Sequence, residues 1–282
     1  MRPLATRPEQ VIVAYNQRDA QIRDRTVRAL RLMWQSAGSW RTGDVDRLVA
    51  RIVPAVEGAK RAVAGNTAAY AQAMAKVQDD RDIPMALMPD QELRQVRGVD
   101  PEVAYRRPAT QMYTALAGGA AFPDALRQGV NRLASIVTTD LQLAKTHQER
   151  RSWQRGGYRY TIRTLTGREN CALCVIASTQ RYTVDKLRPI HPGCDCGSRQ
   201  ISARHDPGQV IDQGLLDSVH DQIETHLERP SDRGARDLGI GKTDSRGEEI
   251  SDYTELVVVR EHGEIGPVLT WRDQKFTSKD DI

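Results

Sequence analysis

The chain has 282 residues, which is enough for one large domain or two medium ones. Aromatic residues make up 5% and charged residues 28% of the chain, so a hydrophobic core has to be built mainly from Leu, Val, Ile and Ala. No run of about 18 apolar residues occurs, so we expect no membrane-spanning helix and no membrane partner. The net charge of +4 is a mild bias that permits a nucleic-acid partner without requiring one.

The first part of the chain shows the periodicity of helices. Apolar residues recur at helical spacing through residues 11–33, after Pro8 and before Gly38. A second helix is predicted over residues 44–77, where Pro54 is expected to kink it or to divide it into two shorter helices. The outer face of the first helix, with Asp19 among its arginines, carries mixed charges that are more typical of a solvated surface than of a binding site.

The next segment, residues 79–101, is rich in Pro and Asp, which predicts an irregular connection with a short turn at residues 91–96. A helix is predicted over residues 102–116, ended by Gly118 and Gly119.

The most regular helix is predicted to lead up to residue 155. Its apolar positions follow steps of three and four residues and predict a buried stripe: Leu126, Val130, Leu133, Val137, Leu141 and Ala144. Its far end, residues 145–151, is basic and polar. His147, Glu149 and Arg150 invite a catalytic interpretation, but a polar helix end at the negative pole of the helix dipole explains the same residues, and we prefer it.

The remainder of the chain alternates short strands with polar segments. Residues 158–163 predict a strand, and residues 182–184 are a candidate return strand. Residues 210–227 predict an amphipathic helix, residues 229–250 a polar linker and residues 256–271 a terminal hairpin.

All four cysteines fall within residues 171–196. Cys171 and Cys174 form a CxxC pair, Cys194 and Cys196 form a CxC pair, and His191 precedes the second pair. A CxxC pair can bring two thiolates onto one ion, and a CxC pair in an extended chain points both side chains to the same face. A tetrahedral site needs four of these five candidates, and the sequence leaves open which four.

Energetics favour a metal over unliganded thiols. The loop between Cys174 and His191 holds 16 residues, and its closure costs roughly 2.5 kcal/mol. Structural zinc returns about 10 to 16 kcal/mol in small peptides. A disulfide needs an oxidising compartment, and residues 1–8 do not resemble a secretory signal. We therefore expect structural Zn²⁺, with a disulfide or redox pair and unliganded thiols as the alternatives.

These residues also carry a resemblance. The stretches Arg168-Glu-Asn-Cys-Ala-Leu-Cys174 and Arg188-Pro-Ile-His-Pro-Gly-Cys-Asp-Cys196 resemble the Mu F-like head morphogenesis domain of bacteriophages, in the form found in phages of actinobacteria. The signature of that family is a CxxC pair, a spacer with a small hairpin and a terminal HPxCxC. The resemblance covers about residues 123–203. It departs at Ala177-Ser178, where the family usually has Gly, and at Asp195, where it usually has Arg.

The resemblance implies a minor capsid protein of the virion that acts by binding. Its partners would be the portal protein and the major capsid or scaffold protein, with packaged DNA as an optional further partner. Its location would be the capsid interior or portal vertex after assembly in the host cytoplasm. We expect a mainly α fold in three parts: a helical domain (1–122), a small α+β zinc-knot domain (123–204), and a C-terminal helix, linker and short β-hairpin (205–282).

The alternative is a capsid maturation protease, because some phage products given that name carry a Mu F-like segment. The sequence contains no GxSxG elbow. Ser178, Ser198 and Ser202 near His205 are available, but no arrangement of serine, histidine and acid stands out. We therefore predict no catalytic and no cofactor-binding residue apart from the metal ligands.

Overall fold

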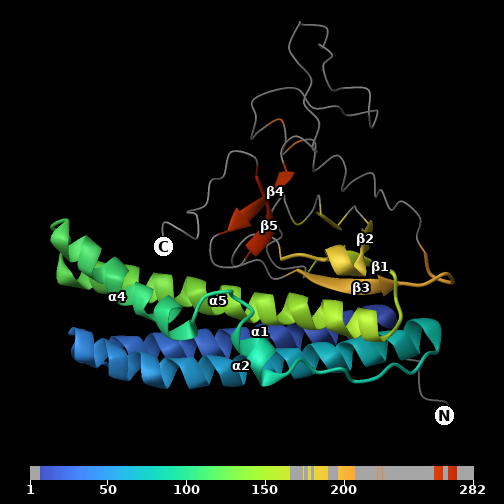
Figure 1. The fold of residues 1–282 in the computed structure, drawn as a ribbon, viewed down its shortest axis with the longest axis horizontal. Coiled ribbons are helices and arrows are strands. Elements are labelled where there is room, and N and C mark those ends of the chain that lie inside the picture. Colours follow the sequence, from blue (N-terminus) through green and yellow to red (C-terminus); the bar gives the residue numbers. More distant parts are fainter. Residues whose placement is uncertain are drawn as a thin grey trace, which may run out of the picture.

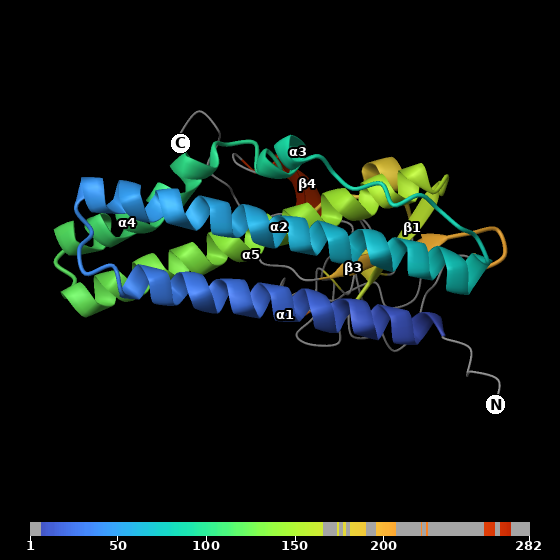
Figure 2. The same cartoon turned by 90° about the horizontal axis from the view of Figure 1, so that it is seen from below.

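The computed structural model describes most of the first 206 residues and two later strands: 7–165, 174, 177, 178, 181–189, 196–206, 221, 224, 257–262 and 266–271. Within this part of the chain the predicted helical character is confirmed. The helices are α1 (Pro8–Gln35), α2 (Thr42–Asp79), α3 (Asp90–Arg94), α4 (Pro101–Ala117) and α5 (Phe122–Arg155). Helices α1, α2 and α5 run along an elongated bundle, and α4 packs beside the first half of α5 (Figures 1 and 2).

Five strands are described. β1 (Tyr160–Thr164) is the central strand of an antiparallel sheet, between β2 (Arg181–Thr183) and β3 (Gly197–Ile201). A 3-10 turn, η1 (Val184–Lys186), follows β2. β4 (Val257–His262) and β5 (Gly266–Trp271) form the predicted terminal hairpin. The predicted helix 210–227 lies outside the described residues except for positions 221 and 224, and the predicted linker 229–250 lies wholly outside them.

The larger of two apolar cores in the described residues receives side chains from α1, α2, α4 and α5 and from the connection before α4. The smaller one includes Tyr15, Tyr70 and Trp153. The predicted stripe of α5 is buried from Val130 to Ala144, and Leu126 is half-buried against the larger core. Helices α4 and α5 approach closely at Gly129, where a Cβ atom would lie 3.0 Å from the carbonyl oxygen of Pro108. The larger core lies on both sides of the predicted boundary at 122/123; the three predicted domains remain predictions.

Pro54 does not divide the second helix, so that part of the expectation is wrong. Helix α2 is continuous across Pro54, whose side chain is exposed. A proline inside a helix removes one backbone hydrogen bond. Its neighbours Ile52, Val53 and Val56 are buried in the core, and this apolar burial holds the helix together through the missing bond.

Residues 80–100, which we call the strap, are fixed along the bundle (Figure 2). The strap contains α3 where the sequence predicted a turn, and its apolar side chains Ile83 and Met88 are buried. The side-chain amide of Gln148 on α5 donates to the carbonyl of Ala86 at 2.9 Å and accepts from the backbone N–H of Met88 at 2.9 Å. The strap is therefore hydrogen-bonded to α5 along its extended part.

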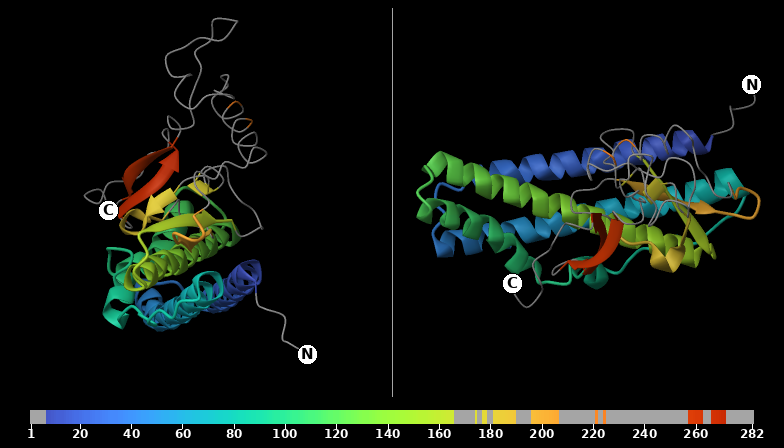
Figure 3. Two further views of the ribbon diagram at one scale, coloured as in Figure 1. Left: turned by 90° about the vertical axis from the view of Figure 1, so that its right-hand side faces the viewer. Right: turned by 90° about the horizontal axis from the view of Figure 1, so that it is seen from above.

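The second half of α5 is polar, as predicted, but several of its polar side chains are buried. Lys145, Gln148 and Glu149 are each 2% exposed or less. These polar side chains are buried because α5 is covered on several sides: α1 and α2 pack against it from the bundle, and β3 and η1 pack against it from the sheet. The sheet lies against α5 on one side of the bundle (Figure 3).

Strand β2 confirms the predicted return strand, since Tyr182 pairs with Thr161 of β1. Strand β3 was not predicted, because its sequence Gly-Ser-Arg-Gln-Ile does not alternate apolar and polar residues. Four of its five residues are buried, and two of these, Ser198 and Gln200, are polar. Among the described residues, no helix combines the length and hydropathy needed to cross a membrane.

The first testable prediction concerns a buried ion pair in the bundle. Arg97 donates from Nε to Asp140 Oδ1 at 2.6 Å, and Tyr105 donates its hydroxyl to Asp140 Oδ2 at 2.7 Å. Replacing Arg97 by Met leaves the Asp140 carboxylate buried without its cation, so we expect the free energy of unfolding to fall by about 3 to 5 kcal/mol in urea titrations.

The matched control is Arg106→Met. Arg106 also pairs with an aspartate, Asp46, at 2.9 Å, but both side chains are about half-exposed. That change should cost less than about 1 kcal/mol. Equal losses for the two variants would contradict the importance given to burial.

Candidate functional site

The described residues include two of the five predicted metal ligands. Cys174 and Cys196 are both buried, 4% and 1% exposed, and Cys196 directly precedes β3. Cys171, His191 and Cys194 lie outside the described residues. The described residues contain no group of three or more His, Cys, Asp or Glu side chains placed to hold a metal. The zinc site therefore remains a prediction.

The surroundings of Cys196 suit a thiolate. Arg163 on β1 donates from Nη1 to the Cys196 sulfur at 3.5 Å, and Gln142 on α5 donates to the Cys196 carbonyl at 3.3 Å. The Lys145 ammonium group interacts electrostatically with Cys196. Cationic neighbours and N–H donors stabilise the deprotonated sulfur, which is the form that binds zinc. The donor environment of Cys196 fits a metal-bound cysteine.

Arg163 also connects the two parts of the cysteine motif. Its second guanidinium nitrogen donates to the carbonyl of Arg188, which belongs to the segment leading to His191. One arginine of the central strand thus contacts the chain on both sides of the segment that holds His191 and Cys194. If a metal binds there, Arg163 would orient its surroundings.

A buried polar cluster lies beneath the sheet, centred on Glu149 of α5. Its other members are Tyr15, Thr67, Trp153 and Ser198, and we call it the Glu149 cluster. Carboxylate atom Oε1 accepts from the Tyr15 hydroxyl at 3.0 Å and from the Ser198 backbone N–H at 3.1 Å. Oε2 accepts from the Ser198 hydroxyl at 3.0 Å, and Trp153 Nε1 donates to that hydroxyl at 3.0 Å. The cluster therefore ties β3 to the bundle.

The buried ionisable groups of this region, Glu149 and Lys145 on α5 and Asp19 on α1, interact with one another. Burial raises the pKa of Glu149 to about 7, although Lys145 and the hydrogen bonds from Ser198 and Tyr15 act in the opposite direction. Burial alone would lower the pKa of Lys145, but Asp19 and Glu149 raise it above its usual value. Lys145 Nζ lies 3.2 Å from Asp19 Oδ2. Asp19, expected on a solvated face, is therefore a buried partner of Lys145, so that expectation is wrong.

A second buried carboxylate, Asp79 at the end of α2, holds the other end of β3. It accepts from Tyr158 Oη at 2.8 Å, Gln200 Nε2 at 3.2 Å and Ser202 Oγ at 2.5 Å. Burial alone would raise the pKa of Asp79, but these hydrogen bonds lower it below its usual value. His205 Nδ1 also lies 3.4 Å from Asp79 Oδ1.

This arrangement brings a serine, a histidine and an aspartate together, but not in catalytic order. In a serine protease the histidine lies between the acid and the serine and accepts the serine proton. Here Ser202 donates its hydroxyl directly to Asp79, and the contact between Ser202 and His205 is made by the backbone N–H of His205 at 3.3 Å. Ser198 is fully buried in the Glu149 cluster, and Ser178 is buried as well. The geometry favours a structural role for these serines.

His147, Glu149 and Arg150, which suggest catalysis by their residue types, do not form one site. Glu149 belongs to the buried cluster, whereas His147 and Arg150 lie on a half-buried face, with Arg150 Nη2 at 3.4 Å from His147 Nδ1. Burial, reinforced by Arg150 and Arg188, lowers the pKa of His147 to about 4. His147 is therefore neutral at physiological pH.

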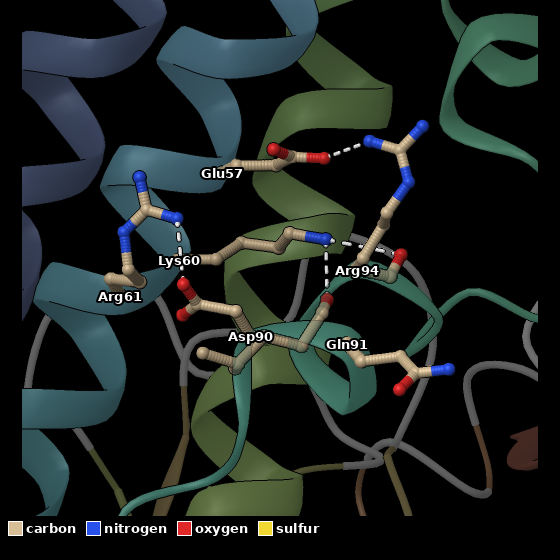
Figure 4. A pocket seen from close by; sticks show the side chains of 7 residues that line it. Glu57, Lys60, Arg61, Asp90, Gln91 and Arg94 are labelled. Carbon is tan, nitrogen blue, oxygen red and sulfur yellow. Dashed lines mark hydrogen bonds and ion pairs between the residues drawn. The ribbon is translucent and has the colours of Figure 1, made fainter.

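A pocket of about 250 Å³ lies between α2 and α3 (Figure 4). Lys60 extends across it and donates to the carbonyls of Leu93 at 2.5 Å and Arg94 at 3.4 Å, at the end of α3. Arg94 contacts Glu57 and Glu102, and Arg61 Nη1 lies 3.5 Å from Asp90 Oδ2. Each cation of the pocket wall thus has a protein partner, which indicates that these groups fasten the strap to α2.

Comparisons with known proteins give no relative: no family model matches the chain, and neither a curated protein nor a solved structure is detectably similar to it.

The polar residues that fasten the sheet were not predicted from the sequence. The signal that could have found them is their helical spacing relative to residues on the buried face of the same helix. Asp19 follows Tyr15 by four residues, and Lys145 and Glu149 continue the apolar stripe of α5 beyond Leu141 at the same spacing.

The second testable prediction concerns pH. The pKa of Glu149 is higher in the fold than in the unfolded chain, so its contribution to stability is complete below about pH 4.5 and is lost as pH rises through 7. The pKa of His147 is lower in the fold, so its contribution is present above about pH 6.5 and is lost as pH falls toward 4. Each effect amounts to about 3 kcal/mol, and the two nearly cancel.

We therefore expect the free energy of unfolding to be nearly flat for the wild type between pH 4.5 and 6.5. In Glu149→Gln it should fall with decreasing pH, by up to about 1.4 kcal/mol per pH unit, and in His147→Gln it should rise. Urea titrations across this range measure both slopes. Identical slopes in the two variants would show that one of these groups is not buried as described.

Proposed function

We propose that this chain is a minor capsid or head morphogenesis protein of a bacteriophage. It binds the portal protein and the major capsid or scaffold protein, and it contains a structural zinc site formed by four of Cys171, Cys174, His191, Cys194 and Cys196. The observation that carries the proposal is the CxxC and HPxCxC pattern. Supporting it, Cys196 is buried at the start of β3 with the Arg163 guanidinium against its sulfur.

The buried polar contacts support a structural role for the sheet. Glu149 and Asp79 each accept hydrogen bonds from β3 or the chain that follows it, at Ser198, Gln200 and Ser202. A closed zinc site would stabilise the same segment and leave no open coordination position for a substrate. The zinc would supply structural cross-linking, while the residues of this chain orient the sheet on α5.

The helical bundle supplies surface for a partner. Helix α1 has 28 residues and α2 has 38, so they extend over about 42 Å and 57 Å at 1.5 Å per residue. A standard protein interface covers about 800 Å² on each partner. The exposed face of such helices is large enough, and we assign the portal or capsid contact to the bundle.

The third testable prediction is the metal content. The full chain, purified after expression in zinc-replete medium, should contain about one zinc per molecule by elemental analysis. Cys196→Ser should lose the metal and the hydrogen-exchange protection of β1 and β3, while the apolar core around α2 keeps its protection. Asp195→Asn, a change between two candidate ligands, is the control and should keep the zinc. Zinc-free wild-type protein would end the claim.

The alternative function is a capsid maturation protease. The observation in its favour is the proximity of Ser202, His205 and Asp79, although Ser202 is bonded to the acid and not to the imidazole. A protease would require these groups to rearrange before the serine could act as a nucleophile.

The fourth testable prediction separates the two functions. Mass spectrometry of virions should detect this chain in the wild-type phage, and a phage lacking its gene should assemble defective heads in which the major capsid protein is processed normally. Loss of capsid processing in that phage, reproduced by Ser202→Ala, would establish the protease. Absence of the chain from intact virions would contradict the minor capsid assignment.

A further inference from the structure

Three basic residues lie near one another beside the sheet: His147 and Arg150 on the half-buried face of α5, and Arg188, whose charge lowers the pKa of both. His147 and Arg150 are one turn apart on α5, and Arg188 follows η1, which packs against α5. None of the three is fully exposed, and none belongs to the buried clusters that fasten β3.

The geometry of these groups is fixed by hydrogen bonds. Arg150 Nη2 lies 3.4 Å from His147 Nδ1. Because an arginine can only donate, Nδ1 is the acceptor and the imidazole proton is on Nε2. Arg188 donates from Nη1 to the carbonyl of Asp185 at 3.1 Å, and its own carbonyl accepts from Arg163. The cluster therefore has two guanidinium groups and one imidazole N–H as donors.

The positive charges in this cluster repel one another. Burial lowers the pKa of Arg150, and Arg188 lowers it further. Burial, Arg150 and Arg188 together hold the pKa of His147 at about 4. Within the part of the chain that the structure describes, no carboxylate forms an ion pair with Arg150 or Arg188, in contrast to the neighbouring Arg151, which lies 3.2 Å from Glu92. The nearby Asp185 side chain is exposed to solvent.

We propose that His147, Arg150 and Arg188 form a binding site for a phosphate group. Guanidinium groups donate paired hydrogen bonds to phosphate oxygens, and a bound dianion would neutralise two like charges that are partly removed from water. The neutral imidazole would add a third donor through Nε2. The phosphate can come from free inorganic phosphate or from a nucleic-acid backbone. This site does not depend on the proposed virion role.

The test uses the full chain and four proteins: wild type, Arg150→Gln, Arg188→Gln and the control Arg151→Gln. Inorganic phosphate is titrated at constant ionic strength, balanced with sodium chloride, and binding is followed by the rise in melting temperature and by the NMR shifts of the His147 ring. Wild type and Arg151→Gln should bind phosphate alike. Arg150→Gln and Arg188→Gln should bind at least about tenfold more weakly.

A second measurement guards against loss of the fold. Arg150→Lys keeps the charge but loses the planar fork, so it should fold and still bind more weakly than wild type. Phosphate should also raise the pKa of His147 in the wild type, because a bound anion favours the imidazolium. Equal phosphate binding in all variants, or none in the wild type, would overturn the proposal.

The source of the phosphate is resolved by two further ligands at the same ionic strength, a short DNA duplex and a poly-glutamate peptide. Competition between duplex and phosphate, lost in Arg188→Gln, identifies a nucleic-acid backbone. Phosphate binding without duplex binding identifies the free anion. Stronger binding of poly-glutamate than of either phosphate ligand would show that the site selects carboxylates, and would contradict the assignment.

Discussion

The position of the sheet depends on the carboxylate of Glu149 and the groups that donate to it. This carboxylate is fully enclosed, and it accepts hydrogen bonds from α1 through Tyr15 and from β3 through both the backbone and the side chain of Ser198. A buried carboxyl group is tolerated only when its hydrogen-bonding capacity is filled. The bundle and the strand therefore fill it together, and neither could be moved away without leaving the carboxylate unsatisfied.

Gly197 allows β3 to approach the Glu149 carboxylate closely. A Cβ atom there would lie 3.0 Å from Thr164 Oγ1 and 3.2 Å from Glu149 Oε1. The strand comes close enough for Ser198 to reach the carboxylate because no side chain separates its first residue from α5. The close approach of α5 therefore requires glycine at position 197, directly after Cys196. This requirement links the cysteine motif to the packing of the bundle.

Much of the helical architecture could be predicted from the sequence, because apolar periodicity and the glycines after α1, α4 and α5 are local signals. The stripe from Val130 to Ala144 and the end of α1 before Gly38 were of this kind. The spacing of Lys145 and Glu149 places them on the buried side of α5, but the site beneath the sheet could not be predicted, because their partners are distant in the sequence. Whether Lys145 is solvated or buried depends on Asp19, which is 126 residues away.

Strand β3 also could not be predicted from its local sequence. A strand with a buried side usually places apolar residues there, but β3 buries the polar Ser198 and Gln200. Hydrogen bonds to the carboxylates of Glu149 and Asp79 help to make that pattern stable. A sequence pattern reports what a segment prefers on its own. In β3 the local preference is overridden by hydrogen-bond partners on other elements, Glu149 on α5 and Asp79 on α2.

The contact between Tyr15 and Glu149 joins residues that are 134 positions apart, so it has a consequence for the order of folding during synthesis. When α1 leaves the ribosome, the partners of Tyr15 and Asp19 on α5 have not yet been made. Distant contacts of this kind are slow to form because the intervening chain must first be ordered. Helix α1 can pack against α2 once α2 has been made, but the buried contacts that Tyr15 and Asp19 make with α5 form only after α5 has emerged.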